Sequence, residues 1–162
     1  MDDDVATVGF DPPIEGGVVA GSDGSDDGQR VLEWSLLEAA AHGEPLHAVR
    51  AWRLAEVAPD AGAPFGIVPS LAECQATVAA ALHRDVERAR AACGATAVAV
   101  QLHAVHTPAE VALLAASHRA RVVVVGHRGR GRLQLVLGSV TEHLLGHAGC
   151  PVVVIGLHHG RP

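Results

Sequence analysis

Two glycines and a glycine–serine pair near the C-terminus have the spacing of a phosphate-binding turn. Gly126 ends a run of four valines, Gly129 follows it, and Gly138-Ser139 precedes a stretch with helical spacing. Three arginines are interleaved with these glycines: Arg128, Arg130 and Arg132. A helix that begins at Ser139 would offer free N–H groups and the positive end of its dipole to an anion, and guanidinium groups would add charge. The stretch therefore predicts an anion site between two buried strands.

A second turn rich in glycine follows the first apolar run of the chain. The run Gly17–Ala20 leads into Gly21-Ser22-Asp23-Gly24-Ser25, which carries one carboxylate. Asp23 has two interpretations in such a turn: its side chain bonds the local backbone, as turn-forming aspartates do, or it binds a ligand. The ligand interpretation gains support if this turn lies across a crevice from the first one.

The elements that must position the two turns alternate between apolar runs and amphipathic stretches. Runs rich in Val, Leu and Ala predict five strands: Gly17–Ala20, Leu46–Trp52, Ala97–His103, Arg121–Val125 and Pro151–Ile155. Capping signals predict four helix starts: the pair Asp26 and Gln29, the box Ser70 and Glu73, Pro108 at a first helical position, and Gly138-Ser139. Typical helix ends occur at His42-Gly43 and at Gly94.

This alternation predicts one α/β domain, an open five-stranded parallel sheet with helices on both faces. The domain is expected over residues 17–157, after a disordered acidic segment at 1–16 and before a flexible tail at 158–162. In such sheets, ligands bind beyond the carboxyl ends of the strands, where the strand order reverses. If the first and fourth strands are neighbours at that point, both glycine-rich turns face one crevice.

The composition of the 162 residues excludes several classes of function. A formal charge of −6 argues against general binding of nucleic acid, and the absence of lysine excludes a P-loop or Schiff-base lysine. The start has neither the basic nor the apolar region of a signal peptide, and no apolar run approaches the length of a membrane span. Cys74, Cys93 and Cys150 form no CxxC pair, which suits a reducing compartment. We expect a cytoplasmic protein that binds no membrane.

Together these features resemble the universal stress protein family, from about Gly17 to Ile155. Members that bind ATP carry G-x2-G-x9-G-[ST] between the fourth strand and the last helix. Gly126, Gly129 and Gly138-Ser139 match that pattern here, with a spacer of eight residues in place of nine. Further matching pieces are Asp23-Gly24-Ser25, Leu46–Trp52, Pro108-Ala109-Glu110 and His147-Ala148-Gly149-Cys150-Pro151. The resemblance implies a Rossmann-like sheet of the adenine nucleotide alpha hydrolase type, with strand order 3-2-1-4-5.

The resemblance also implies a site for ATP, with Mg²⁺ carried by the nucleotide. The Asp23 carboxylate and the strand backbone near Val49 would hold the adenine and ribose. The loop glycines would let the backbone approach the triphosphate, and N–H groups at the start of the last helix, with the Ser139 hydroxyl, would bind phosphate oxygens. The implied site residues are Gly21, Asp23, Val49, Gly126, His127, Arg128, Gly129, Arg130, Gly138, Ser139 and Val140.

A protein of this kind would be a nucleotide-responsive regulator in the stress response. Bound phosphates would draw residues 126–139, together with the long loop 53–69, into one conformation that a regulatory protein partner reads. The last strand, Pro151–Ile155, is short and apolar and presents an edge. As in relatives, such an edge implies a homodimer that pairs through this strand.

Two other interpretations stay open at this point, and a metal site is not expected. The same site could hydrolyse ATP or transfer nucleotidyl groups, but no Ser-His-Asp order or paired carboxylates stand out, so we assign no catalytic residue and expect at most slow hydrolysis. The shortened spacer could instead have removed nucleotide binding and left a dimeric scaffold. His143 and His147, with Cys150 nearby, lack a further zinc ligand, so no metal site made of protein side chains is expected.

Overall fold

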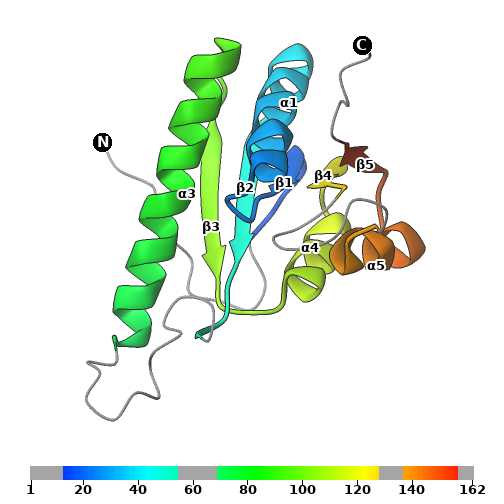
Figure 1. Ribbon diagram of the computed structural model, residues 1–162. Helices are drawn as coiled ribbons and strands as arrows, with labels where there is room; N and C mark the ends of the chain where they lie inside the picture. Colours follow the sequence, from blue (N-terminus) through cyan, green and yellow to red (C-terminus); the bar gives the residue numbers. More distant parts are fainter. Residues whose placement is uncertain (1–12, 55–68, 128–136, 157–162) are drawn as a thin grey trace, which may run out of the picture.

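The computed structural model describes residues 13–54, 69–127 and 137–156 of the chain. Within these ranges, five parallel strands form one sheet in the order β3-β2-β1-β4-β5 (Figure 1). The strands are β1 (Val18–Gly21), β2 (Leu46–Ala51), β3 (Val100–Val105), β4 (Val122–Gly126) and β5 (Val152–Ile155). The predicted α/β class and strand order are confirmed, and the order reverses between β1 and β4.

Helices cover both faces of the sheet, as the alternating pattern predicts. They are α1 (Asp26–His42), α3 (Leu71–Cys93), α4 (Ala109–Ser117) and α5 (Ser139–His147). Figure 1 shows α1 and α3 side by side on one face, with α4 and α5 together on the other. None of these described helices is both long enough and apolar enough to cross a membrane.

Each face of the sheet has its own apolar core, because successive side chains of a strand point to opposite sides. Val18 and Ala20 of β1 belong to one cluster with Leu32 of α1. Val19, which lies between them, belongs to the other cluster with Leu144 of α5. All five side chains are fully buried. Strands that are apolar on both faces are what a parallel sheet between two helical layers requires.

Most of the predicted helix ends are confirmed. Ser70 and Glu73 form the predicted capping box at the start of α3. Gly43 and Gly94 follow α1 and α3 in the left-handed conformation, with φ of 64° and 72°. Pro108, however, is the N-cap of α4 and not its first helical residue, because its ψ of 139° lies outside the helical region.

The start of α1 differs from the predicted capping pair of Asp26 and Gln29. The N-cap is Ser25, whose hydroxyl accepts the Gly28 N–H at 3.1 Å. Gln29 lies within the helix and donates from its side chain to Glu33 at 3.3 Å. Serine and aspartate are both good N-cap residues, and the bond of Ser25 to the third helical N–H selects it here.

The third strand begins later than the predicted range of 97–103 and runs on to Val105. A side chain explains its shortened start. The guanidinium of Arg90, on α3, donates to the carbonyl oxygens of Thr96 and Val98 at 3.1 and 2.9 Å. These two carbonyls are bonded to a helix side chain in place of a neighbouring strand.

The expectation of a disordered segment over residues 1–16 fails for its last residues. The side chain of Ile14 is fully buried in the core under α4 and α5, and the Gly16 N–H donates to the Arg119 carbonyl at 2.9 Å. Residues 1–12, the tail 158–162 and most of the predicted loop 53–69 lie outside the described residues.

Candidate functional site

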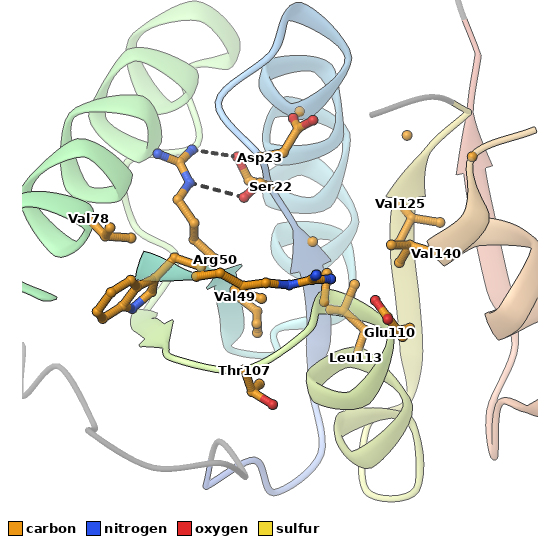
Figure 2. Close-up of a pocket in the computed structure, with 18 of the residues that line it drawn as sticks. Ser22, Asp23, Val49, Arg50, Val78, Thr107, Glu110, Leu113, Val125 and Val140 are labelled. Carbon is orange, nitrogen blue, oxygen red and sulfur yellow. Dashed lines mark hydrogen bonds between the residues drawn. The ribbon is translucent and has the colours of Figure 1, made fainter. Parts of the chain in front are cut away.

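The carboxyl ends of β1, β2 and β4 open into a pocket of about 760 Å³ (Figure 2). Residues of α3, α4 and α5 complete its wall. β1 and β4 are paired neighbours, with Val18 opposite Val122. Both the turn after β1 and the described residues on either side of 128–136 therefore reach the same space. A pocket therefore lies where the strand order reverses, which is where the sequence predicted a crevice between the two turns.

Hydrogen bonds hold the Asp23 carboxylate in the pocket wall. Asp23 Oδ1 accepts the Ser25 N–H at 3.0 Å and the Ser25 hydroxyl at 2.5 Å. The same Ser25 hydroxyl caps α1 by accepting the Gly28 N–H. Gly24 has a φ of 80°, which glycine adopts without strain. Asp23 is thus both a turn former and a pocket residue, so the two interpretations of this carboxylate do not exclude each other.

Arg50, in β2, is a pocket residue that the sequence motifs did not identify. Its guanidinium donates from Nε to the Ser22 carbonyl at 3.1 Å and from Nη2 to the Ser22 hydroxyl at 3.0 Å (Figure 2). Nη2 also donates to Asp85 Oδ2 on α3 at 2.7 Å. Only 7% of Arg50 is exposed. A charged residue inside an apolar strand needs buried partners, and this mismatch was the signal available in the sequence.

The floor of the pocket on the α4 side is apolar. Val49, Leu113 and Val125 line it and belong to the core on that face of the sheet. Gly21 lies directly against this floor, and a Cβ there would stand 2.8 Å from Leu113 Cδ1. The Val49 carbonyl accepts the Ser22 N–H at 3.0 Å, so this backbone group is already used within the sheet.

Trp52 extends the apolar lining beyond the end of β2. Its indole Nε1–H donates to Gln75 Oε1 at 2.8 Å, and Gln75 Nε2 donates in turn to the Ala104 carbonyl at 2.6 Å. The indole also stacks on His106, with ring centroids 4.4 Å apart. These contacts fix one large aromatic ring at the wall between β2 and α3.

The amino end of α5 lines the pocket with Gly138, Ser139 and Val140. Gly138 is its N-cap, and its N–H donates to the His127 carbonyl at 3.0 Å. The buried Thr141 hydroxyl donates to the Gly126 carbonyl at 2.8 Å. These two bonds join the start of α5 to the end of β4. The N–H groups of Ser139 and Val140, which have no partner inside a helix, lie at the positive end of its dipole.

The structure brings most of the predicted site residues together. Those that line the pocket are Gly21, Asp23, Val49, Gly126, Gly138, Ser139 and Val140. His127 follows β4 directly, but it is not a lining residue, and its N–H donates to the Ile155 carbonyl at 2.8 Å. Arg128, Gly129 and Arg130 lie outside the described residues. Besides Arg50 and Trp52, lining residues without a sequence motif include Thr77, Val78, Thr107, Leu113 and Val125.

Among the described residues, no group of three or more His, Cys, Asp or Glu could hold a metal ion. His143 and His147 stack on each other on α5, with ring centroids 4.6 Å apart, and His147 Nδ1 lies 2.9 Å from the His143 carbonyl oxygen. Burial raises the pKa of the Cys150 thiol, which lies partly buried beside the same helix.

Comparison with known proteins shows the family of this chain. The model of the universal stress protein family matches residues 17–156. A universal stress protein of Mycolicibacterium smegmatis is 32% identical over 144 residues, which cover 87% of this chain and 48% of the relative. The chain spans about half the length of the curated relatives that it matches.

Solved structures are similar over nearly the whole chain. A universal stress protein in complex with cAMP is 25% identical, with a TM-score of 0.61, over 87% of this chain and 95% of that one. A universal stress protein from Archaeoglobus fulgidus in complex with dAMP is 19% identical, with a TM-score of 0.50, over 88% and 98% of the two chains. With the fold and the match over residues 17–156 in agreement, this chain belongs to the universal stress protein family.

Proposed function

We propose that this protein binds an adenine nucleotide, ATP with Mg²⁺, and acts in the cytoplasm as a nucleotide-responsive regulator in the stress response. One observation carries the proposal: a held carboxylate, an apolar floor and the amino end of a helix meet in a single pocket. These features suit a ribose, a base and a phosphate respectively. The similar protein solved with cAMP supports this class of ligand, since cAMP carries adenine, ribose and phosphate.

We assign the backbone contact with the base to Ala51, at the end of β2. Trp52 donates its N–H to the Val105 carbonyl on β3 at 2.9 Å. Adjacent residues of a strand direct their N–H groups to opposite sides, so the N–H and C=O of Ala51 face the β1 side. The last pair of that ladder is Gly21 with Val49, which means that Ala51 extends past the end of β1.

Ala51 thus takes the backbone contact with the base that the resemblance to the family assigns to the strand near Val49. The Val49 carbonyl is bonded to Ser22, whereas its side chain lines the floor on which a base would lie. Ala51 presents a donor and an acceptor side by side, and adenine presents an amino donor beside a ring-nitrogen acceptor. Guanine carries a carbonyl in place of that amino group, so the same backbone edge disfavours it.

The phosphates are assigned to the amino end of α5. The N–H groups of Ser139 and Val140, together with the Ser139 hydroxyl, would bind phosphate oxygens. Because Gly138 and Thr141 are bonded to His127 and Gly126, the eight-residue spacer does not separate α5 from β4. Phosphate binding would select one conformation of residues 126–139 and 53–69, and a regulatory protein partner would read that state.

The test is thermal unfolding of the purified protein with and without Mg-ATP, after any nucleotide released by heat has been identified. Ligand at about a hundred times its Kd adds about 2.7 kcal/mol, which moves the midpoint of a domain of this size by several degrees. Asp23→Ala is expected to remove the shift. Glu44→Ala is the matched control, because it removes a carboxylate that pairs with Arg121 outside the pocket.

Parallel titrations with AMP, cAMP and GTP define the ligand. A shift of the unfolding midpoint with cAMP but not with ATP would support an adenine nucleotide as the ligand and would replace ATP by cAMP. The absence of any shift at millimolar concentrations, with no nucleotide carried through purification, would overturn the proposal and favour a scaffold. Turnover of ATP above background that Asp23→Ala abolishes would make hydrolysis part of the function.

We also propose that two copies pair through β5, which is the last strand of the described sheet. All four of its residues are half-buried. The carbonyls of Pro151 and Ile155 accept N–H groups of Val123 and His127, so the backbone of Val154, one residue before Ile155, faces outward. Val154→Pro removes an outward N–H and is expected to yield monomers in light scattering. A wild-type protein that is already monomeric at micromolar concentration would overturn this pairing.

A further inference from the structure

One guanidinium joins three walls of the pocket. Arg50 extends from β2 and donates to both the carbonyl and the hydroxyl of Ser22, at 3.1 and 3.0 Å (Figure 2). It also donates to Asp85 at 2.7 Å. Asp85 belongs to α3, which supplies another part of the pocket wall. Arg50 therefore connects β2, the turn that carries Asp23, and α3.

Neutralising Asp85 does not by itself account for this arrangement. A buried arginine is costly unless charged partners compensate it, and the Arg50 side chain is only 9% exposed. Asp85 has a second arginine, because Arg88 Nη2 donates to its other oxygen at 2.7 Å. The Arg88 side chain is 66% exposed and avoids the cost of burial. Of the two arginines that donate to Asp85, only Arg50 also donates to Ser22, the residue before Asp23.

The Asp23 carboxylate is held from the opposite side by α1. Ser25 donates twice to Asp23 Oδ1, and the Gly28 N–H donates to the Ser25 hydroxyl. These bonds fix the tip of the side chain but not the backbone that carries it. The backbone just before Asp23 is held at two points: the Ser22 N–H donates to the Val49 carbonyl, and the Ser22 carbonyl accepts from Arg50.

We propose that Arg50 is a positioning residue of the nucleotide site, which sets the direction of the Asp23 carboxylate by holding Ser22. The proposal rests on the function proposed above, with Asp23 as the group that meets the ribose. A carboxylate held in its bound direction loses less freedom when ligand arrives than one that must be ordered. Arg50 thereby tunes affinity through Asp23.

The first test needs no ligand. The Ser25 N–H donates to the Asp23 carboxylate, so its hydrogen-exchange rate, measured by NMR, reports how well the turn is held. Arg50→Gln is expected to raise that rate at least about tenfold. Arg121→Gln is the matched control, because Arg121 also donates to two partners, Glu38 and Glu44, but lies outside the pocket. It is expected to leave the rate unchanged.

A further variant separates positioning from charge. Arg50→Lys keeps a cation beside Asp85 but lacks the planar fork that reaches both oxygens of Ser22. The exchange rate should therefore stay high in Arg50→Lys, and wild-type protection of Ser25 in this variant would overturn the proposal. If Arg50→Gln alone does not fold, the double variant Arg50→Gln/Asp85→Asn takes its place, since it removes both buried charges.

The second test is a double-mutant cycle on Mg-ATP affinity. Arg50→Gln and Asp23→Asn are each expected to weaken binding by roughly tenfold, and the double variant should bind no more weakly than Asp23→Asn alone. Equal losses from Arg50→Gln in both backgrounds would mean that Arg50 does not act through Asp23, which overturns the proposal. If the wild type binds no nucleotide, the proposed function fails, while the exchange rate of Ser25 still decides whether Arg50 holds the turn.

Discussion

A single methyl group on Gly28 would displace the Asp23 carboxylate. A Cβ at this position would stand 2.9 Å from Asp23 Oδ1 and 3.2 Å from the Ser22 hydroxyl oxygen. Gly28 is buried in the first turn of α1. Because Gly28 has no side chain, the Asp23 carboxylate, which lines the pocket, fits beside α1.

Gly28→Ala is expected to weaken Mg-ATP binding with little change in stability. Alanine gains up to about 1 kcal/mol of helix propensity, which offsets the crowding against Asp23. Calorimetric titration should give a loss of affinity of roughly tenfold, because the displaced carboxylate no longer meets the ribose. Gly146→Ala in α5 is the control: its Cβ would have no neighbour within 4 Å, so only stability should rise. Unchanged affinity in Gly28→Ala would contradict the role of Asp23.

Thr141→Val is expected to affect phosphate binding more than base binding. The variant removes the bond from the buried Thr141 hydroxyl to the Gly126 carbonyl and should cost about 1–2 kcal/mol in urea denaturation. It also loosens the start of α5 from the end of β4, where the phosphates are assigned. The affinity for ATP should therefore fall more than that for adenosine. Equal losses for the two ligands would argue against phosphate binding at α5.

Gln75→Leu is expected to destabilise the fold by roughly 2–4 kcal/mol, because two buried polar groups lose their partner. These are the indole N–H of Trp52 and the carbonyl of Ala104, which Gln75 joins. The chain has two tryptophans, so Trp34→Phe leaves Trp52 as the single fluorescent reporter. Urea denaturation followed by its emission measures the loss. A denaturation midpoint equal to that of Trp34→Phe alone would show that this network contributes no stability.

The buried pair of His47 and His103 links stability to pH. Their rings stack, and His47 Nδ1 lies 3.1 Å from His103 Nε2. Burial lowers the pKa of His47 below its ordinary value of 6.5. Burial, with a smaller contribution from His47, lowers the pKa of His103 to about 4. As the pH falls below 6.5, the unfolded chain therefore takes up protons that the folded protein does not.

Stability is thus expected to be complete above about pH 6.5 and to fall between about pH 6.5 and pH 4, by up to about 3 kcal/mol for His103. Urea denaturation at a series of pH values measures this slope. His103→Gln removes one titrating group and should flatten it, whereas His83→Gln, at an exposed position of α3, should not. The same slope in His103→Gln as in the wild type would assign the pH dependence to other groups.

Patterns of neighbouring residues predicted the strands, most helix ends and the location of the pocket. The runs of valine and alanine required burial on both faces, which only a parallel sheet between helices provides. The capping box of Ser70 and Glu73 could be read from the sequence because its bonds join residues three apart. The glycine-rich turns indicated an anion site for the same reason, since Gly138 and Ser139 begin a helix by themselves.

The errors occurred where a contact with another element overrides the local pattern. The third strand starts late because Arg90, on another element, binds the carbonyls of Thr96 and Val98. Ile14 lies in a segment whose composition is typical of disorder, but it reaches a core built by later parts of the chain. Neither contact can be predicted from the pattern of the residues around it.

The sequence by itself determined the class of the fold, because this depends on local periodicity. Its motifs also carried the resemblance to the family and indicated the turn after β1 and the start of α5 as parts of the pocket. The tertiary structure alone decided which backbone group at the end of β2 is open and what Arg50 holds. β1 ends opposite Val49, so Ala51 extends past its end. The partners of Arg50, Ser22 and Asp85, lie 28 and 35 residues away from it. Such relationships exist only once the sheet has brought separate segments to one edge.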